Sequence, residues 1–234
     1  MKRKIRGLFF MIVCTGMLLA CADAFSAPYT AKPIEARVVD AETGKPLEGT
    51  IVVLNWELVD SDNLPMGQLF IAETVTGNDG KFSFPAWGPK PVPPNSSMDQ
   101  KAPQLLLFKE GFQYRRLANP ATTGASRSSA LDADWSGKTI EMWRLPEDVI
   151  VKLGPGRVVS KRSLSFNGLG FSLGWAYRGG DCEWKQVPRM LVAVHRTKLE
   201  FDRQGLRTNL KSIDDLPRSD KCGSPRDYLR EYLP

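Results

Sequence analysis

The sequence is poor in the residues that build most metal sites and nucleophilic active sites. Its 234 residues include one histidine, His195, and four cysteines. A zinc ion takes three or four protein ligands, usually His, Cys or carboxylate side chains. We therefore expect no bound metal or other cofactor, and we place His195 on the surface of a helix.

Two oxygen-rich stretches are the remaining candidates for cation binding. Residues 60–63 and 132–134 each carry two aspartates. An EF-hand loop requires glycine at its sixth position, and counting from Asp60 that position is Pro65. We interpret these carboxylates as solvated loop residues.

The chain also lacks a strong charge bias once its first segment is set aside. The formal net charge is +6, but four basic residues and no acidic residue precede Cys21, which leaves +2 for the rest. A nearly balanced surface offers no electrostatic footprint for nucleic acid. We expect no nucleic-acid partner.

No apolar run is long enough to cross a membrane as a permanent helix. The run from Leu8 to Ala20 has about a dozen residues, whereas a spanning helix needs about 20. Basic residues precede this run and small residues follow it, which is the order of a secretory signal peptide. We assign residues 1–20 to that signal and expect the mature protein to be exported.

The end of the run offers two cleavage sites. The tetrapeptide Leu-Leu-Ala-Cys that ends at Cys21 resembles a bacterial lipobox, in which the cysteine is lipidated and becomes the first mature residue. This resemblance implies a lipid anchor in the membrane, and Ala22 in place of aspartate favours the outer membrane, facing the periplasm. The alternative is ordinary cleavage after Ala24, which would release a soluble periplasmic protein.

Cysteine use fits export to an oxidising compartment. Cys14 lies within the discarded segment and Cys21 is the candidate lipid site, so Cys182 and Cys222 remain as one pair. Exported domains join such pairs as disulfides. We predict a Cys182–Cys222 disulfide, with two buried free thiols as the alternative.

The first half of the mature chain has short apolar segments separated by turn residues. Residues 40–46 and 77–80 supply the Asp, Asn, Gly and Pro that tight connections use. Segments rich in β-branched and aromatic residues, without intervening helices, indicate a β-sandwich. The predicted strands are Ile34–Val39, Thr50–Leu58, Leu69–Thr76, Lys81–Phe84, Leu105–Phe108, Gln113–Leu117 and Thr139–Trp143.

Three motifs follow one another in this half. They are Asp40 with Thr43, Gly44, Pro46 and Leu47; then Asp79, Gly80 and Phe82; then Gly111 and Phe112. Together they resemble the carboxypeptidase regulatory-like domain of the transthyretin-like superfamily, over about residues 33–117. The resemblance implies a seven-stranded β-sandwich that serves as an accessory module and has no catalytic residues. We therefore predict a mainly β fold, with the sandwich in residues 33–145 and a tether in residues 21–32.

Two longer connections interrupt the strand pattern. Residues 85–97 are rich in proline, which favours polyproline II. We interpret them as a stiff crossover between the two sheets; the alternative is an exposed segment whose Trp87 contacts a partner. Residues 118–136 are rich in small and polar side chains and are interpreted as a flexible surface loop.

Residues 146–234 are predicted to form a small α-helical C-terminal region. Apolar residues at helical spacing predict a helix from about Trp184 to Gln204. Ser224 followed by proline predicts the start of a short final helix. Glycines leave residues 157–177 ambiguous.

One motif suggests catalysis. Residues 170–174 match the G-x-S-x-G form of a serine-hydrolase nucleophile elbow, with Ser172 as the nucleophile and His195 as the available base. That elbow needs a preceding strand and a surrounding parallel sheet, whereas a β-sandwich precedes it here. We assign no catalytic residue and interpret the small residues as helix packing.

These observations favour a non-enzymatic envelope lipoprotein. Its sandwich would act as an accessory module that binds an envelope protein or glycan, and the helical tail would support it through packing and the disulfide. The alternatives are a serine hydrolase that uses Ser172 and a purely structural spacer. The sequence contains no motif that identifies a ligand.

Overall fold

The computed structural model describes residues 28–119, 135–147, 149–154, 157–178 and 182–233. The predicted signal peptide, Cys21 and the aspartates of residues 132–134 lie outside the described residues. Within the described residues, no helix is long and apolar enough to cross a membrane.

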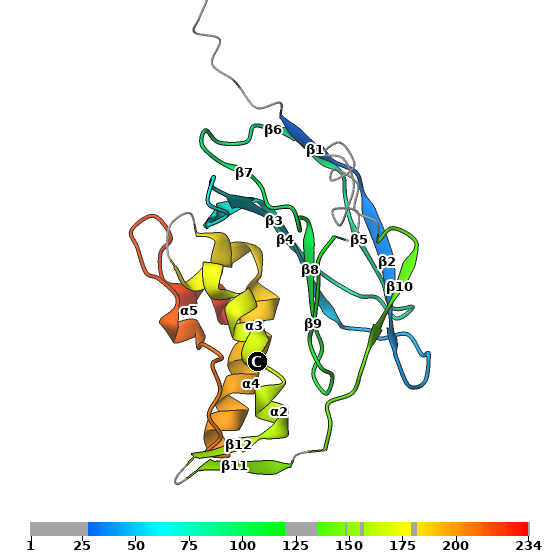
Figure 1. The fold of residues 1–234 in the computed structure, drawn as a ribbon, viewed down its shortest axis with the longest axis vertical. Coiled ribbons are helices and arrows are strands. Elements are labelled where there is room, and N and C mark those ends of the chain that lie inside the picture. Colours follow the sequence, from blue (N-terminus) through cyan, green and yellow to red (C-terminus); the bar gives the residue numbers. More distant parts are fainter. Residues whose placement is uncertain (1–27, 120–134, 148, 155–156, 179–181, 234) are drawn as a thin grey trace, which may run out of the picture.

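Each of the seven predicted strands is present, and together they form two sheets (Figure 1). One sheet has the order β10-β2-β5 and the other has the order β4-β3-β8-β9. All of these pairings are antiparallel except β10 with β2, which is parallel. The strands are β2 Ile34–Asp40, β3 Ile51–Val59, β4 Pro65–Val75, β5 Lys81–Phe84, β8 Gln104–Phe108, β9 Arg115–Leu117 and β10 Lys138–Met142.

Three further short strands lie in segments that were predicted as tether and crossover. β1 (Tyr29–Ala31) pairs with β6 (Trp87–Lys90), and β7 (Ser97–Met98) pairs with β3. The last residues of the predicted tether are therefore part of a sheet. Gly88 permits the close approach of β1, because its φ is +108° and a Cβ there would lie 2.6 Å from the Tyr29 carbonyl oxygen.

Trp87 is half-buried against the sandwich, in contrast to the alternative of an exposed aromatic. Its ring stacks on Phe70 at 4.6 Å and on Tyr29 at 5.3 Å between centroids, and it meets Trp56 edge-on at 4.9 Å. Contact among these four large rings removes apolar surface from water, with Tyr29 and Trp56 buried and Phe70 and Trp87 half-buried. This gain fixes the proline-rich segment against the sandwich.

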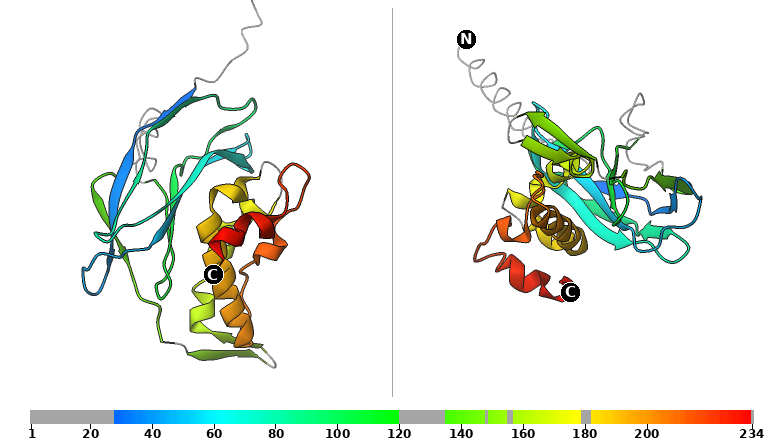
Figure 2. Two further views of the ribbon diagram at one scale, coloured as in Figure 1. Left: turned by 180° about the vertical axis from the view of Figure 1, so that it is seen from behind. Right: turned by 90° about the horizontal axis from the view of Figure 1, so that it is seen from below.

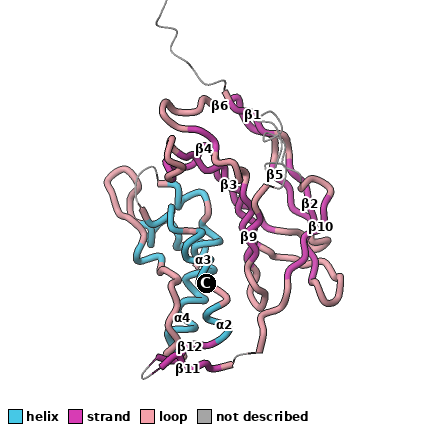
Figure 3. The backbone as a smooth tube through the Cα atoms, viewed as in Figure 1, coloured by secondary structure: helices cyan, strands magenta, loops and turns pink. Residues whose placement is uncertain are grey.

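The C-terminal region forms a third layer on the outer face of the β4-β3-β8-β9 sheet (Figures 2 and 3). The prediction of an α-helical region is wrong at its start, because the region opens with an antiparallel β-hairpin. The elements are β11 Ile150–Gly154, β12 Arg157–Ser160, α2 Lys161–Leu164, α3 Asn167–Ser172, η2 Gly174–Tyr177, η3 Glu183–Gln186, α4 Pro188–Arg203, η4 Ile213–Asp215, α5 Pro225–Tyr228 and η5 Leu229–Tyr232.

The long helix begins four residues later than predicted. α4 starts at Pro188, and the residues from Glu183 to Gln186 form the separate 3-10 turn η3. A residue before proline is biased away from the α conformation, and Val187 has φ −135° and ψ 48°. This break separates η3 from α4.

The β4-β3-β8-β9 sheet lies between the other sheet and the helical layer, and it is buried on both of its faces. Along β8, Leu105 and Leu107 join the core between the two sheets, while Leu106 and Phe108 join the core beneath the helices. All five residues of β8 are buried, unlike the alternating pattern of a sheet with one wet face. The helical layer thus covers apolar surface that the sandwich alone would expose.

The motif residues of the sandwich stabilise turns. The Asp40 carboxylate accepts hydrogen bonds from the backbone N–H of Glu42 at 2.9 Å and from Arg144 at 2.6 Å. Burial would raise the pKa of Asp40, but these hydrogen bonds and the Arg144 charge outweigh it and hold that pKa below its usual value. Gly80 adopts φ +74°, and a Cβ there would collide with the carbonyl oxygen of Val38.

Candidate functional site

The structure gives Ser172 and His195 different partners. The Ser172 hydroxyl donates to the Gly168 carbonyl oxygen at 2.9 Å, one helical turn back. Nδ1 of His195 lies 3.1 Å from the hydroxyl of Ser212. A nucleophile elbow also needs a strand before its serine, and Ser172 instead ends the short helix α3. The local geometry is that of helix packing.

The placement of His195 on a helix surface is wrong. His195 is 8% exposed, because its side of α4 is covered by the segment that carries Ser212. Burial lowers the pKa of His195, and the carboxylate of Asp214 opposes that shift. Ser212 caps η4 and also contacts Asp214, which is paired with Arg226 at 2.7 Å. The histidine therefore helps to join α4 to the following chain.

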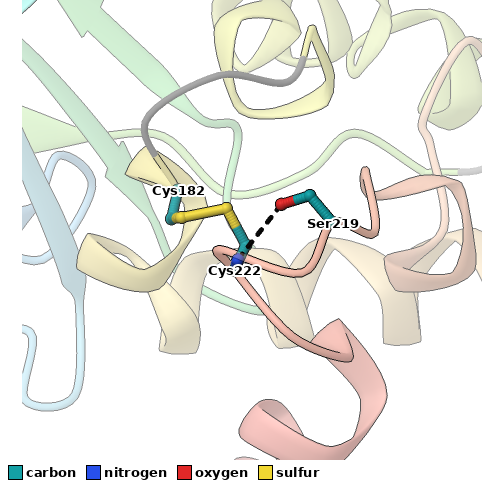
Figure 4. The surroundings of a disulfide bond; sticks show 3 residues. All are labelled: Cys182, Ser219 and Cys222. Carbon is teal, nitrogen blue, oxygen red and sulfur yellow. Dashed lines mark hydrogen bonds between the residues drawn. A yellow bond between two sulfur atoms is a disulfide. The ribbon is translucent and has the colours of Figure 1, made fainter.

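The Cys182–Cys222 disulfide is present (Figure 4). The two Cα atoms are 5.5 Å apart, and the bond spans 40 residues of sequence. Cys182 immediately precedes η3, while Cys222 lies in a turn where its backbone N–H donates to Ser219 at 3.1 Å. The bond fixes the start of the η3–α4 segment to the chain that leads into α5.

No group of three or more His, Cys, Asp or Glu side chains suited to a metal ion occurs in the described part of the chain. The Asp60 carboxylate accepts backbone N–H groups of Asp62 and Leu64 at 2.9 and 2.8 Å. It closes the turn between β3 and β4.

A carboxylate from the sandwich caps the N-terminus of α4. Glu73, on β4, accepts hydrogen bonds from the backbone N–H groups of Arg189 at 3.0 Å and Met190 at 2.7 Å. Val187, the residue at the N-cap position, provides no capping side chain, and Pro188 has no N–H. Burial raises the pKa of Glu73, while the two backbone donors and the Arg189 side chain oppose the shift. This cap orients α4 on the sheet.

Beside this cap, a groove of about 610 Å³ lies between α4 and the ends of β3 and β4. Ile51 and Val75 are register partners on β3 and β4, and both line the groove. On α4 the lining residues are spaced i, i+3, i+4 and i+7, which places them on one helical face. They are Arg189, Val192, Ala193 and Arg196. The groove has an aliphatic floor and an arginine at each end of its helical wall.

The C-terminal turn η5 completes the groove. Tyr232 lines it, and the guanidinium of Arg189 lies 5.4 Å from the centre of the Tyr232 ring. Arg196 donates to the Tyr232 carbonyl oxygen at 3.2 Å. Glu231 also lines the groove and is exposed. The site is therefore built from the sandwich, the long helix and the C-terminal segment together.

Sequence reasoning did not find this groove. The spacing of Arg189, Val192, Ala193 and Arg196 could have indicated a mixed helical face. That β3 and β4 face it could not be read from the sequence, because Glu73 and the α4 N-terminus are more than a hundred residues apart.

No protein-family model matches the chain, and no curated protein matches it. Solved structures with a similar backbone include the pilus 2b backbone protein of group B streptococcus, at 16% identity and a TM-score of 0.26, covering 49% of this chain and 41% of that one. A mutant catechol 1,2-dioxygenase of Acinetobacter radioresistens has 14% identity and a TM-score of 0.30, covering 56% of each chain. The major pilin SpaD of Corynebacterium diphtheriae has 12% identity and a TM-score of 0.26, covering 51% of this chain and 31% of that one.

The chain thus spans about two fifths of the streptococcal protein and just over half of the dioxygenase. These values are too low to transfer an activity, ligand or partner. The strands and their pairing show a mainly β sandwich with a helical layer on one face.

Proposed function

We propose that this chain is an exported, non-enzymatic envelope protein that binds another envelope macromolecule. The supporting observation is the groove between α4 and the sandwich, whose walls come from three separate parts of the chain. Its volume lies within the range of about 300–1,000 Å³ that ligand sites occupy. The different partners of Ser172 and His195 argue against the serine-hydrolase alternative.

Site-specific photo-crosslinking in intact cells tests this proposal. A benzoylphenylalanine at Ala193, inside the groove, should give a discrete adduct. The matched control is the same probe at Ser61, an exposed residue of the turn between β3 and β4. The adduct from Ala193 should be lost when Arg196→Glu is added. The purely structural spacer predicts no adduct from Ala193, and equal adducts from both sites would also refute the proposal.

We further propose that Cys21 anchors the protein to the outer membrane by lipid. Stable tethering requires more than one acyl chain, as a bacterial lipoprotein cysteine provides. Cys21→Ser should leave unprocessed precursor or a soluble periplasmic protein. Unchanged membrane fractionation together with an unchanged mature mass would rule out lipidation at this residue and would favour cleavage after Ala24.

A further inference from the structure

The two groove arginines keep most of their hydrogen-bonding capacity. Arg196 is exposed, and one of its N–H groups donates to the Tyr232 carbonyl oxygen. A guanidinium has five N–H donors in a planar fork. The fork can therefore bind a carboxylate in bidentate fashion without breaking the contact to Tyr232.

Arg189 forms an ion pair with Glu73, but most of its N–H donors are left for a ligand. The two oxygens of Glu73 accept the backbone N–H groups of Arg189 and Met190, and the Arg189 guanidinium remains 3.7 Å from Glu73. Its side chain is 53% exposed. The remaining N–H donors of this guanidinium can face a ligand while the ion pair with Glu73 and the helix cap are both kept. The groove thus presents to a bound segment two positive groups that lie about two turns apart on one face of α4, together with one carboxylate, that of Glu231.

The surfaces between the arginines suit aliphatic side chains. Ile51, Val75 and Ala193 offer the accessible aliphatic surface here, and Val75 is 36% exposed, whereas Val192 is only 2% exposed. A sugar-binding site usually presents an open aromatic face, whereas Arg189 lies over the ring of Tyr232. The lining therefore fits a polypeptide better than a glycan.

We propose that the groove binds a segment of a partner protein in which acidic residues alternate with aliphatic ones. A carboxylate of that segment pairs with Arg196, a second pairs with Arg189, and the aliphatic side chains pack on Val75 and Ile51. This inference rests on the proposed binding function and specifies the chemistry of its ligand.

Fluorescence polarisation with designed peptides tests the inference on the purified full mature chain carrying Cys21→Ser. The probe is a labelled decapeptide of alternating leucine and glutamate, and the matched peptide has glutamine in place of glutamate. The acidic peptide should bind at least about tenfold more tightly than the neutral one, as expected when charged hydrogen bonds are lost. Arg196→Gln should weaken binding of the acidic peptide by about the same factor.

Arg203→Gln is the control variant, because Arg203 lies on the same helix but outside the groove. Its guanidinium donates to the carbonyl oxygen of Leu199, one helical turn back. The Arg203→Gln change should leave binding unchanged, and both variants should melt at the wild-type temperature. Equal binding of the two peptides, or equal loss in the two variants, would overturn the inference.

Two further probes separate failure of this inference from failure of the proposed function. Alginate oligosaccharides and phosphatidylglycerol vesicles carry negative charge without a peptide backbone. Binding of either one in place of the acidic peptide, abolished by Arg196→Gln, would overturn the peptide assignment. An Arg196-dependent adduct at Ala193 in cells would still support a binding groove in that case.

Discussion

Removal of the Glu73 carboxylate should loosen the helical layer from the sandwich. In Glu73→Ala, the backbone N–H groups of Arg189 and Met190 lose their acceptors, and no side chain at the N-cap of α4 replaces them. Hydrogen bonds to charged groups contribute about 1.5–3 kcal/mol each. Relief from burying a carboxylate and hydration of the freed N–H groups offset part of that loss.

We expect a net decrease of about 2 kcal/mol in the free energy of unfolding, at the upper end of measured N-cap losses. For a chain of this size, that decrease corresponds to a lower melting temperature by about 4–8 °C. Chemical denaturation followed by tryptophan fluorescence measures it, since Trp184 is 1% exposed in the helical layer. Hydrogen exchange should also accelerate at the amides of Arg189 and Met190.

Asp202→Ala provides the comparison, because Asp202 forms an exposed i,i+4 ion pair with Lys198 near the other end of α4. Such a pair contributes about 0.3–0.5 kcal/mol. If Glu73→Ala lowers the free energy of unfolding no more than Asp202→Ala does, and the amides of Arg189 and Met190 exchange at their wild-type rates, the Glu73 cap does not hold the layers together.

Three other perturbations follow from the structure. Burial raises the folded-state pKa of Glu73 above its ordinary value of 4.5. The free energy of unfolding of the wild type relative to Glu73→Gln should therefore be greatest below pH 4.5 and should decline as the pH rises through the folded-state pKa. Denaturation at several pH values measures this difference, and a difference that stayed constant or grew with pH would contradict the prediction. Replacing Cys182 and Cys222 by serine should lower the free energy of unfolding by up to about 4 kcal/mol, because the bond spans 40 residues. Thiol titration of the denatured, unreduced wild-type mature protein should detect neither cysteine. Gly80→Ala should destabilise the fold more than Gly44→Ala, because both glycines have positive φ but only at Gly80 would a Cβ meet the backbone; equal melting temperatures of the two variants would argue against the steric reason.

The sandwich strands could be predicted because their signals are local. Alternation of apolar and polar side chains has a period of two residues, and turn residues separate the segments. The predicted Lys81–Phe84 has the same bounds as β5, and the other six predicted strands overlap their observed counterparts. The error at the start of α4 was also local in origin, since Pro188 was available as a signal for a later start.

The error at His195 and the alternative left open at Trp87 both depended on contacts between distant segments. Trp87 stands in a proline-rich stretch that has no strong strand pattern, and its partial burial depends on Tyr29, Phe70 and Trp56. His195 was placed on a surface because a single histidine gives no periodic signal. The Leu105–Phe108 run did carry a signal for a strand covered on both faces, which would have indicated the third layer.

The sequence by itself determined the strands, the turns at Asp40 and Gly80, and the pairing of two cysteines by elimination. Each of these depends on chemistry within a few residues or on a simple count. Only the tertiary structure decided that Glu73 caps α4 and that the Arg189–Arg196 face meets β3 and β4. The physical reason is that side-chain periodicity shows which face of a helix or strand is apolar, but it does not show which distant element packs against that face.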